Sequence, residues 1–184
     1  DTIELTAVRD VKIKVTNGTD PVKDATVTIV DGNGKPHESK TGEDGNAIVP
    51  KVPAPTEGTV TVEKDGRVVT VPVKVDKDGN ATPGTIDIAN PAIKAVAVTV
   101  VDAKTKEGIQ GAAVTVGAQT ATAGGADGKV TLHLLGGAQY RMVAQKDGYA
   151  DSAVMVSVDD EGTAKPDTIE LTAVRDVKIK VTNG

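Results

Sequence analysis

Apolar residues recur at every second position over much of the chain, which is the spacing of a β-strand with one buried face. Near the start, Val11, Ile13 and Val15 alternate with polar residues. The same alternation recurs in later segments, among them 25–29, 69–75, 96–100, 130–134 and 154–158. β-branched residues at alternate positions suit a half-buried pleated surface. No segment carries a helical stripe, so the pattern predicts an all-β fold.

Asp-Gly pairs punctuate the alternating segments. They begin at Asp31, Asp44, Asp65, Asp78, Asp127 and Asp147. In such a pair Gly supplies the positive φ that a tight hairpin turn requires. Short strands joined by turns about every ten residues are typical of an immunoglobulin-like β-sandwich.

The chain also repeats itself. Residues 1–18 and 167–184 are identical, at an offset of 166 residues, and residues 85–88 mark a weaker period of half that length. Repeats of this kind decide an architecture, so we expect two tandem sandwich modules in an elongated arrangement. The expected boundaries are 1–8 for the last strand of a preceding module, 9–90 for module A, 91–174 for module B and 175–184 for the first strand of the next copy of module A.

The segments between modules are short. Residues 6–10 separate Leu5 from Val11, and residues 89–95 separate Ile88 from Val96. Neither segment has the Gly/Ser-rich composition of a flexible tether. We expect the last strand of one module to run almost directly into the first strand of the next, which predicts a stiff rod. A short hinge that bends freely is the alternative.

Composition narrows the function. The chain has 184 residues with two Tyr and neither Phe nor Trp, so its core must be built from aliphatic side chains. Its net charge of −5 is spread without blocks, whereas a nucleic-acid binder would show a basic patch and stacking rings; that class is excluded. No apolar run reaches the about 20 residues of a membrane-spanning helix. The absence of Cys excludes disulfides and thiolate chemistry.

Four motifs in module B form a familiar set. They are a G-A-x-V-x-V strand at 111–116, a D-G turn at 127–128, a G-x-x-Y step at 137–140 and a K-x-G-Y hairpin at 146–149. With them, module B resembles the carboxypeptidase regulatory-domain-like family and the collagen-adhesin B-type repeats, which are transthyretin-like members of the immunoglobulin-like sandwiches. Module A keeps the D-A-T-V-T-I strand at 24–29 but lacks both tyrosines. The resemblance implies a structural or spacer module of secreted and surface proteins, without catalytic residues or cofactors.

Calcium binding is the first candidate chemistry. Asp76, Asp78 and Asn80 place oxygen atoms at positions 1, 3 and 5 of a possible loop, with Asp87 at position 12. An EF-hand loop requires Gly at position 6 and Glu at position 12, and here position 6 is Ala81. A hairpin turn explains the motif more simply, so these are weak metal candidates. Two further acidic clusters of the same standing lie at 31–34 and 159–161.

Two covalent modifications are also candidates. Asn17 and Asn80 begin N-x-[ST] sequons on predicted turns, which makes them glycosylation candidates. The collagen-adhesin likeness suggests a Lys–Asn isopeptide bond, for which Lys12 or Lys14 with Asn90 would be the partners. Both lysines alternate with apolar residues and so point outward, where a protonated Lys is a poor nucleophile.

The remaining polar residues suggest no reaction. His133 is expected to face away from Leu132 and Leu134, and His37 lies in the polar segment 35–40, so nothing pairs the two histidines as a metal site requires. No serine lies in a G-x-S-x-G setting, and there is no phosphate-binding loop. We expect no enzyme and no cofactor.

The sequence therefore favours a structural repeat unit of an extracellular fibre, stalk or surface adhesin that acts as a stiff spacer. Its partners would be neighbouring modules of the same chain or identical chains, with carbohydrate or a host-surface protein bound, if at all, at a distant tip domain. One alternative is a module that itself binds carbohydrate or a host protein. Another is a self-assembling filament subunit that donates residues 167–184 to the sheet edge of another chain.

Overall fold

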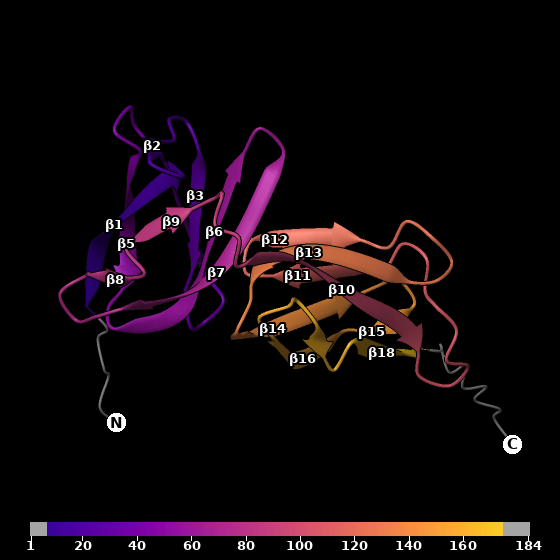
Figure 1. The fold of residues 1–184 in the computed structure, drawn as a ribbon. Coiled ribbons are helices and arrows are strands. Elements are labelled where there is room, and N and C mark those ends of the chain that lie inside the picture. The colour runs from indigo at the N-terminus through magenta and orange to yellow at the C-terminus, as the bar shows by residue number, and fades with distance from the viewer. Residues whose placement is uncertain (1–6, 175–184) are drawn as a thin grey trace, which may run out of the picture.

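The computed structural model describes residues 7–174, which form β-strands joined by turns (Figure 1). The all-β fold expected from the alternation is confirmed. The expected end strands at 1–8 and 175–184 lie outside the described residues, apart from Ala7 and Val8. Within the described range, no helix is long and apolar enough to cross a membrane.

The N-terminal half of the molecule, residues 8–88, contains two groups of paired strands. The first is built on β1 (Val8–Asn17), whose partners are β2 (Asp20–Pro21), β5 (Asn46–Pro53) and β9 (Thr85–Asp87). The second is antiparallel and runs in the order β4 (Pro36–Lys40), β3 (Thr26–Val30), β6 (Thr56–Lys64), β7 (Arg67–Val75) and β8 (Ala81–Thr82).

The C-terminal half, residues 93–174, repeats this arrangement. Its first group is built on β10 (Ile93–Asp102), with β13 (Lys129–Leu135), β18 (Thr168–Ala173) and, on β18, β15 (Tyr149–Ala150). Its second group runs in the order β12 (Gln119–Thr122), β11 (Ala113–Val116), β14 (Ala138–Gln145), β16 (Ser152–Val158) and β17 (Ala164–Lys165).

The pairing pattern relates the two halves strand by strand. In each half the first long strand pairs in parallel with the last one, so Val15 lies beside Ile86 and Val100 lies beside Ile169. The first long strand also pairs antiparallel with its sheet partner, β1 with β5 and β10 with β13. These registers make residues of one half directly comparable with residues of the other.

Each half encloses its own apolar core between its two groups of strands. In the N-terminal half the inward positions of β1 and β3, among them Ile13, Val27 and Ile29, are fully buried. In the C-terminal half the core includes Leu132, Leu134 and Met142. The aliphatic residues that alternate in the sequence are thus the ones that the two layers bury.

The Asp-Gly turns agree with the sequence at some positions and differ at one. Asp65 and Gly66 both have positive φ, as a two-residue hairpin turn requires. At 31–34 a turn does join β3 and β4, but the expected positive φ at Gly32 is wrong, because Gly34 takes it instead. The reason is local: the buried Asp31 carboxylate accepts hydrogen bonds from the N–H groups of Asn33 and Lys35, which folds a longer loop.

Candidate functional site

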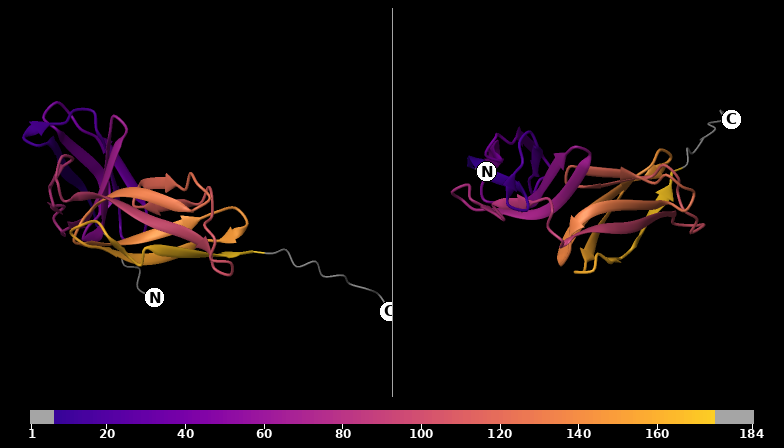
Figure 2. Two further views of the ribbon diagram at one scale, coloured as in Figure 1. Left: turned by 45° about the vertical axis from the view of Figure 1, so that its right-hand side comes forward. Right: turned by 45° about the horizontal axis from the view of Figure 1, so that its top comes forward.

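The two halves meet at a junction that joins their sheets. Leu134 of β13 forms a parallel bridge with Thr70 of β7, so that strands from both halves belong to one nine-stranded sheet. In both views of Figure 2 the N-terminal half forms one end of the molecule and the C-terminal half forms the other. The junction residues are Thr61 and Thr70 in the N-terminal half, and Ile93, Ala118, Gln119, Leu134, Leu135 and Tyr140 in the C-terminal half.

Two threonines form the N-terminal side of the junction. Because side chains alternate along a strand, Val60, Val62 and Val71 enter the core while Thr61 and Thr70 point to the opposite face. Such threonines would normally face water, yet Thr61 is 4% and Thr70 is 0% exposed. Their hydroxyl oxygens lie 3.0 Å apart and share a hydrogen bond across β6 and β7. The C-terminal half therefore covers the outer face of this sheet.

Polar groups of the β11–β12 hairpin satisfy these threonines. The Ala118 N–H donates to Thr61 Oγ1 at 3.2 Å. The Gln119 amide, oriented with its nitrogen toward Thr70, donates to Thr70 Oγ1 at 3.1 Å and to the His133 carbonyl at 3.2 Å, and its oxygen accepts from the His133 N–H at 3.1 Å. Rotating the halves relative to each other would break these hydrogen bonds and leave buried polar groups without partners, which costs free energy. The hydrogen bonds therefore favour one orientation of the two halves.

Tyr140 is the buried aromatic residue of this junction. Its side chain is 1% exposed, and its hydroxyl donates to the Leu135 carbonyl at 2.9 Å. The same hydroxyl lies 3.4 Å from the Thr70 carbonyl oxygen of the other half. Burial raises the pKa of Tyr140 well above its ordinary value. The neutral phenol is therefore the form that the junction holds.

Apolar contacts add to the polar ones. Ile93 and Leu135 face each other at the start of the β10–β13 pair, and both pack against the core of the N-terminal half. The C-terminal half thus inserts two aliphatic side chains into its neighbour's core surface. Removing apolar area from water stabilises such a contact by about 25 cal/mol per Å².

The connection between the halves is itself held by hydrogen bonds. The Asp87 side chain accepts from the N–H groups of Gly18 and Ala89, which ties the start of the connection to the β1–β2 turn. The Asn90 side chain accepts from the Ala92 N–H, and the Ile93 N–H donates to the Asn90 carbonyl. The segment between Ile88 and Ile93 is therefore a structured turn rather than a tether.

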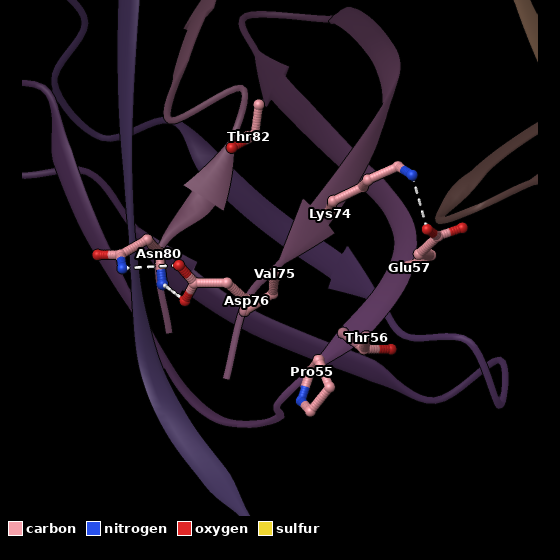
Figure 3. A pocket seen from close by; sticks show the side chains of 8 residues that line it. All are labelled: Pro55, Thr56, Glu57, Lys74, Val75, Asp76, Asn80 and Thr82. Atoms are coloured by element: carbon pink, nitrogen blue, oxygen red, sulfur yellow. Dashed lines mark hydrogen bonds and ion pairs between the residues drawn. The ribbon is translucent and has the colours of Figure 1, made fainter. Parts of the chain in front are cut away.

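The calcium candidates lie in an exposed turn beside a hollow of about 480 Å³ (Figure 3). One Asp76 oxygen accepts from the N–H groups of Asp78 and Asn80, and the other accepts from the Asn80 side-chain amide. The Asn80 hydrogen bonds hold the pKa of Asp76 below its ordinary value. Asp78 pairs with Lys77, and Asp87 caps the connection instead. In the described part of the chain, no group of three or more acidic, His or Cys side chains is arranged to hold a metal.

The two sequon residues occupy different settings. Asn17 is exposed at the end of β1 and pairs with Asp20, so the two-residue loop consists of Gly18 and Thr19. Asn80 is exposed, but its amide nitrogen already donates to Asp76. Glycosylation of either residue stays a prediction.

The isopeptide partners are not arranged for that reaction. Lys12 and Lys14 are exposed on β1, on the side opposite the buried Val11 and Ile13. The Asn90 side chain is engaged in the turn between the halves. A desolvated Lys beside a buried carboxyl, which the reaction needs, is not formed by these residues.

One buried polar pair was not indicated by the residue pattern. His37 Nε2 lies 3.0 Å from Asp31 Oδ2, and both side chains are buried. Burial alone would raise the pKa of Asp31, but the hydrogen bonds from His37, Lys35 and Asn33 outweigh it and hold that pKa below its ordinary value. The polar character of segment 35–40 did not indicate this partner of His37. His133 is exposed and faces away from its buried neighbours, as expected.

Comparison with known proteins gives similarity in structure alone. No family model and no curated protein matches the sequence, so the likeness to carboxypeptidase regulatory-domain-like and collagen-adhesin repeats stays a prediction. Among solved structures, the chain is similar to the TIE protein of Bacillus anthracis at 16% identity, with a TM-score of 0.38, covering 91% of this chain and 34% of that one. It thus spans about a third of the TIE chain.

Two pilus proteins have similar scores. One is the shaft pilin SpaA of Lactobacillus rhamnosus GG, at 11% identity and a TM-score of 0.35, with 94% of this chain and 100% of that chain covered. The other is the pilus 2b backbone protein of group B streptococcus, at 16% identity and a TM-score of 0.37, with 91% and 87% covered. Each is a protein to which this chain is similar at low identity.

Proposed function

We propose that the chain is a structural repeat unit of an extracellular fibre, stalk or surface adhesin, in which it acts as a stiff spacer. The unit consists of two sandwich modules, 9–90 and 91–174. Residues 1–8 close a preceding module, and residues 175–184 open the next copy of the first one. Its partners are neighbouring modules, and its function is mechanical.

The observation that carries the proposal is the junction. A spacer keeps its length only if adjoining modules hold their orientation. Here the Thr70–Gln119 contact, the Ala118–Thr61 hydrogen bond and the packing of Leu135 on the neighbouring core all oppose rotation between the halves. The hydrogen-bonded turn from Ile88 to Ile93 restricts bending of the connection between the halves.

The repeat in the sequence supports the same conclusion. Residues 1–18 and 167–184 are identical, so the segment 8–18, with which the N-terminal half begins, recurs at 174–184, at the end of the C-terminal half. A chain that continues in this way repeats the described junction once in every pair of halves. Stacked repeats also gain stability from their neighbours, which suits a core without Phe or Trp.

The alternatives find less support. A carbohydrate site usually presents an exposed aromatic ring, but Tyr140 is buried and Tyr149 is half-buried. A donated strand over 167–184 would need those residues free, whereas Thr168–Ala173 already pairs with β10 and β15 of its own chain. Residues 175–184 lie outside the described range.

Small-angle X-ray scattering on chains of one, two and three repeat units tests the spacer function. The maximum dimension of a stiff array grows in proportion to the number of units, whereas that of a flexible chain grows roughly with its square root. Proportional growth is expected, and square-root growth would contradict the proposal.

A flexible insertion tests the junction within the same series. Four Gly/Ser residues between Asn90 and Pro91 should broaden the distance distribution, because they release the turn that joins the halves. The same insertion between Gly124 and Gly125, in an exposed loop away from the junction, is the matched control. If the two insertions behave alike, the junction is not what keeps the molecule extended.

A further inference from the structure

Four large apolar side chains are conspicuously exposed among the described residues. They are Val8 at 51%, Ile48 at 52%, Met155 at 57% and Val174 at 59%. Val174 is the repeated counterpart of Val8, because residues 167–184 duplicate residues 1–18. The repeat thus places exposed apolar side chains at the outer ends of both halves.

Strand register gives Val8 a counterpart at the junction. Val8 faces Pro53 at the start of the β1–β5 pair, just as Ile93 faces Leu135 at the start of the β10–β13 pair. The residues next to them agree, since the Ala54 N–H donates to the Ala7 carbonyl and the Gly136 N–H donates to the Ala92 carbonyl. Val8 and Pro53 therefore occupy the places of Ile93 and Leu135, the two side chains that the C-terminal half packs on its neighbour's core.

The receiving face also has a counterpart. Thr61 lies opposite Thr70 in the β6–β7 pair, and the equivalent residues opposite each other in the β14–β16 pair are Val143 and Ala153. The two threonines are buried by the other half, whereas Val143 is half-buried and Ala153 is exposed. The exposed Met155 stands on the same face, two residues along β16. At these two positions the uncovered face carries Val143 and Ala153 in place of the threonines, and the exposed Arg141 lies opposite Met155 on the same face.

We propose that the N-terminal half of the next copy in the same chain docks on the face formed by Val143, Ala153 and Met155. Val174 and the next copy's equivalent of Pro53 take the places that Ile93 and Leu135 have at the described junction. This inference rests on the proposed function, since it requires a further copy.

The connection to that half is two residues shorter than the one at the described junction. At the described junction, Ala92 follows Ile88 after four residues, whereas Ala173, the repeated counterpart of Ala7, follows Leu171 after two. β18 continues to Ala173, and the Val174 N–H donates to the Gly148 carbonyl at 2.9 Å. The next half therefore begins directly at the edge of β15 and β18, without an intervening turn.

The two methionines offer a direct test. Met142 and Met155 are the only methionines of the sequence, and residues 19–90 contain none. A chain extended after Gly184 by a further copy of residues 19–90 therefore still shows two methyl signals in a ¹³C-methyl-methionine NMR spectrum. Met142 is fully buried in its own core and serves as the internal reference.

In the extended chain, the Met155 methyl signal should shift and lose its broadening by a soluble paramagnetic agent, while the Met142 signal stays in place. In the chain of residues 1–184 the Met155 signal should be broadened freely. A Met155 signal that is equally accessible in both chains would overturn the proposal. Protection of Met155 that grows with protein concentration would also overturn it, because the face would then be occupied by another molecule.

A pair of variants provides a second readout. Met155→Glu should lower the thermal midpoint of the extended chain by several degrees and leave that of the 1–184 chain nearly unchanged. Ile48→Glu, at an equally exposed apolar residue on β5, should affect both chains alike. Equal effects of Met155→Glu in both chains would contradict the docking. Scattering on the same extended chain separates the two proposals: an elongated chain with an accessible Met155 retains the spacer function and refutes only this interface.

Discussion

Removing a single hydroxyl tests how the junction is held together. Tyr140→Phe keeps the ring, which is 1% exposed, and deletes the group that donates to the Leu135 carbonyl at 2.9 Å. That carbonyl would be left without this donor in a partly buried place. An unsatisfied buried group costs about 1–3 kcal/mol. For a unit of about 80 residues, the size of one half, each kcal/mol corresponds to a shift of the thermal midpoint of about 4–8 °C.

The pH dependence of the same variant gives a sharper result. Burial raises the pKa of Tyr140 in the folded chain above its value in the unfolded chain, which is about 10. The stability that comes from the neutral phenol is therefore fully present below pH 10 and is lost as the pH rises above it. The loss is about 1.4 kcal/mol per pH unit for one such group.

Urea unfolding followed by far-UV circular dichroism at pH 8, 10 and 11 measures both effects. The wild type should be more stable at pH 8, and the difference should shrink as the pH increases to 11. Every other ionisable group is common to the two proteins, so its contribution cancels in the comparison. If the two proteins lose stability in parallel above pH 10, Tyr140 is not held neutral by its burial and the reasoning fails.

Two further predictions concern the N-terminal half. Gly58→Ala should destabilise it by more than about 2 kcal/mol, because the added Cβ would clash with the Val30 carbonyl oxygen. Gly124→Ala, where a Cβ meets nothing within 4 Å, is the control in urea unfolding. Equal midpoints for the two variants would contradict the packing argument. Asp31→Asn should flatten the loss of stability in acid: a lowered folded-state pKa contributes stability above the unfolded value of about 3.9 that is lost as the pH falls through the folded one. A pH scan of thermal midpoints from 6 to 2 checks this, and parallel acid limbs would refute it.

The aliphatic core could be predicted from the sequence because its signal is local. Val11, Ile13 and Val15 alternate with polar residues and are all fully buried. The Asp65-Gly66 turn was predictable for the same reason, since Gly adopts positive φ without steric cost and Asp tolerates it. In such segments the residue pattern and the fold agree without help from distant residues.

The Asp31–His37 pair had no such signal. β4 reads Pro-His-Glu-Ser-Lys and contains no aliphatic residue that would indicate an inward face. Its inward positions are set by pairing with β3, where His37 lies opposite the buried Ile29. The burial of His37 is therefore a property of the neighbouring strand and cannot be read from its own segment.

The junction was hidden for a related reason. Alternation correctly assigns Thr61 and Thr70 to the outer face of their sheet, and an outer face of threonines normally indicates solvent. What covers it is the hairpin tip at Ala118 and Gln119, about fifty residues further along the chain. Periodicity reports which way a side chain points and says nothing about a neighbour that lies beyond the sheet.

The buried ring of Tyr140 shows that the two halves are not interchangeable. Tyr140 lies opposite Val156 in β14–β16, and the equivalent residue opposite Val73 in β6–β7 is Gly58. At Gly58 the Val30 carbonyl occupies the space that a side chain would need, so a ring has no room there. The end of the C-terminal half therefore meets its neighbour through a phenol and threonine hydroxyls.

The corresponding end of the N-terminal half must use other groups, and it offers Val8 and Pro53. On the docking proposed above, an extended chain alternates between a polar junction anchored by Tyr140 and an apolar junction at Met155. Exchanging one half for the other would place a Gly where the ring is needed and a Tyr where the Val30 carbonyl lies. If the halves were interchangeable, the same residues could recur after each half. With two different junctions, the same residues recur only after each pair of halves, and the sequence repeats residue for residue at an offset of 166.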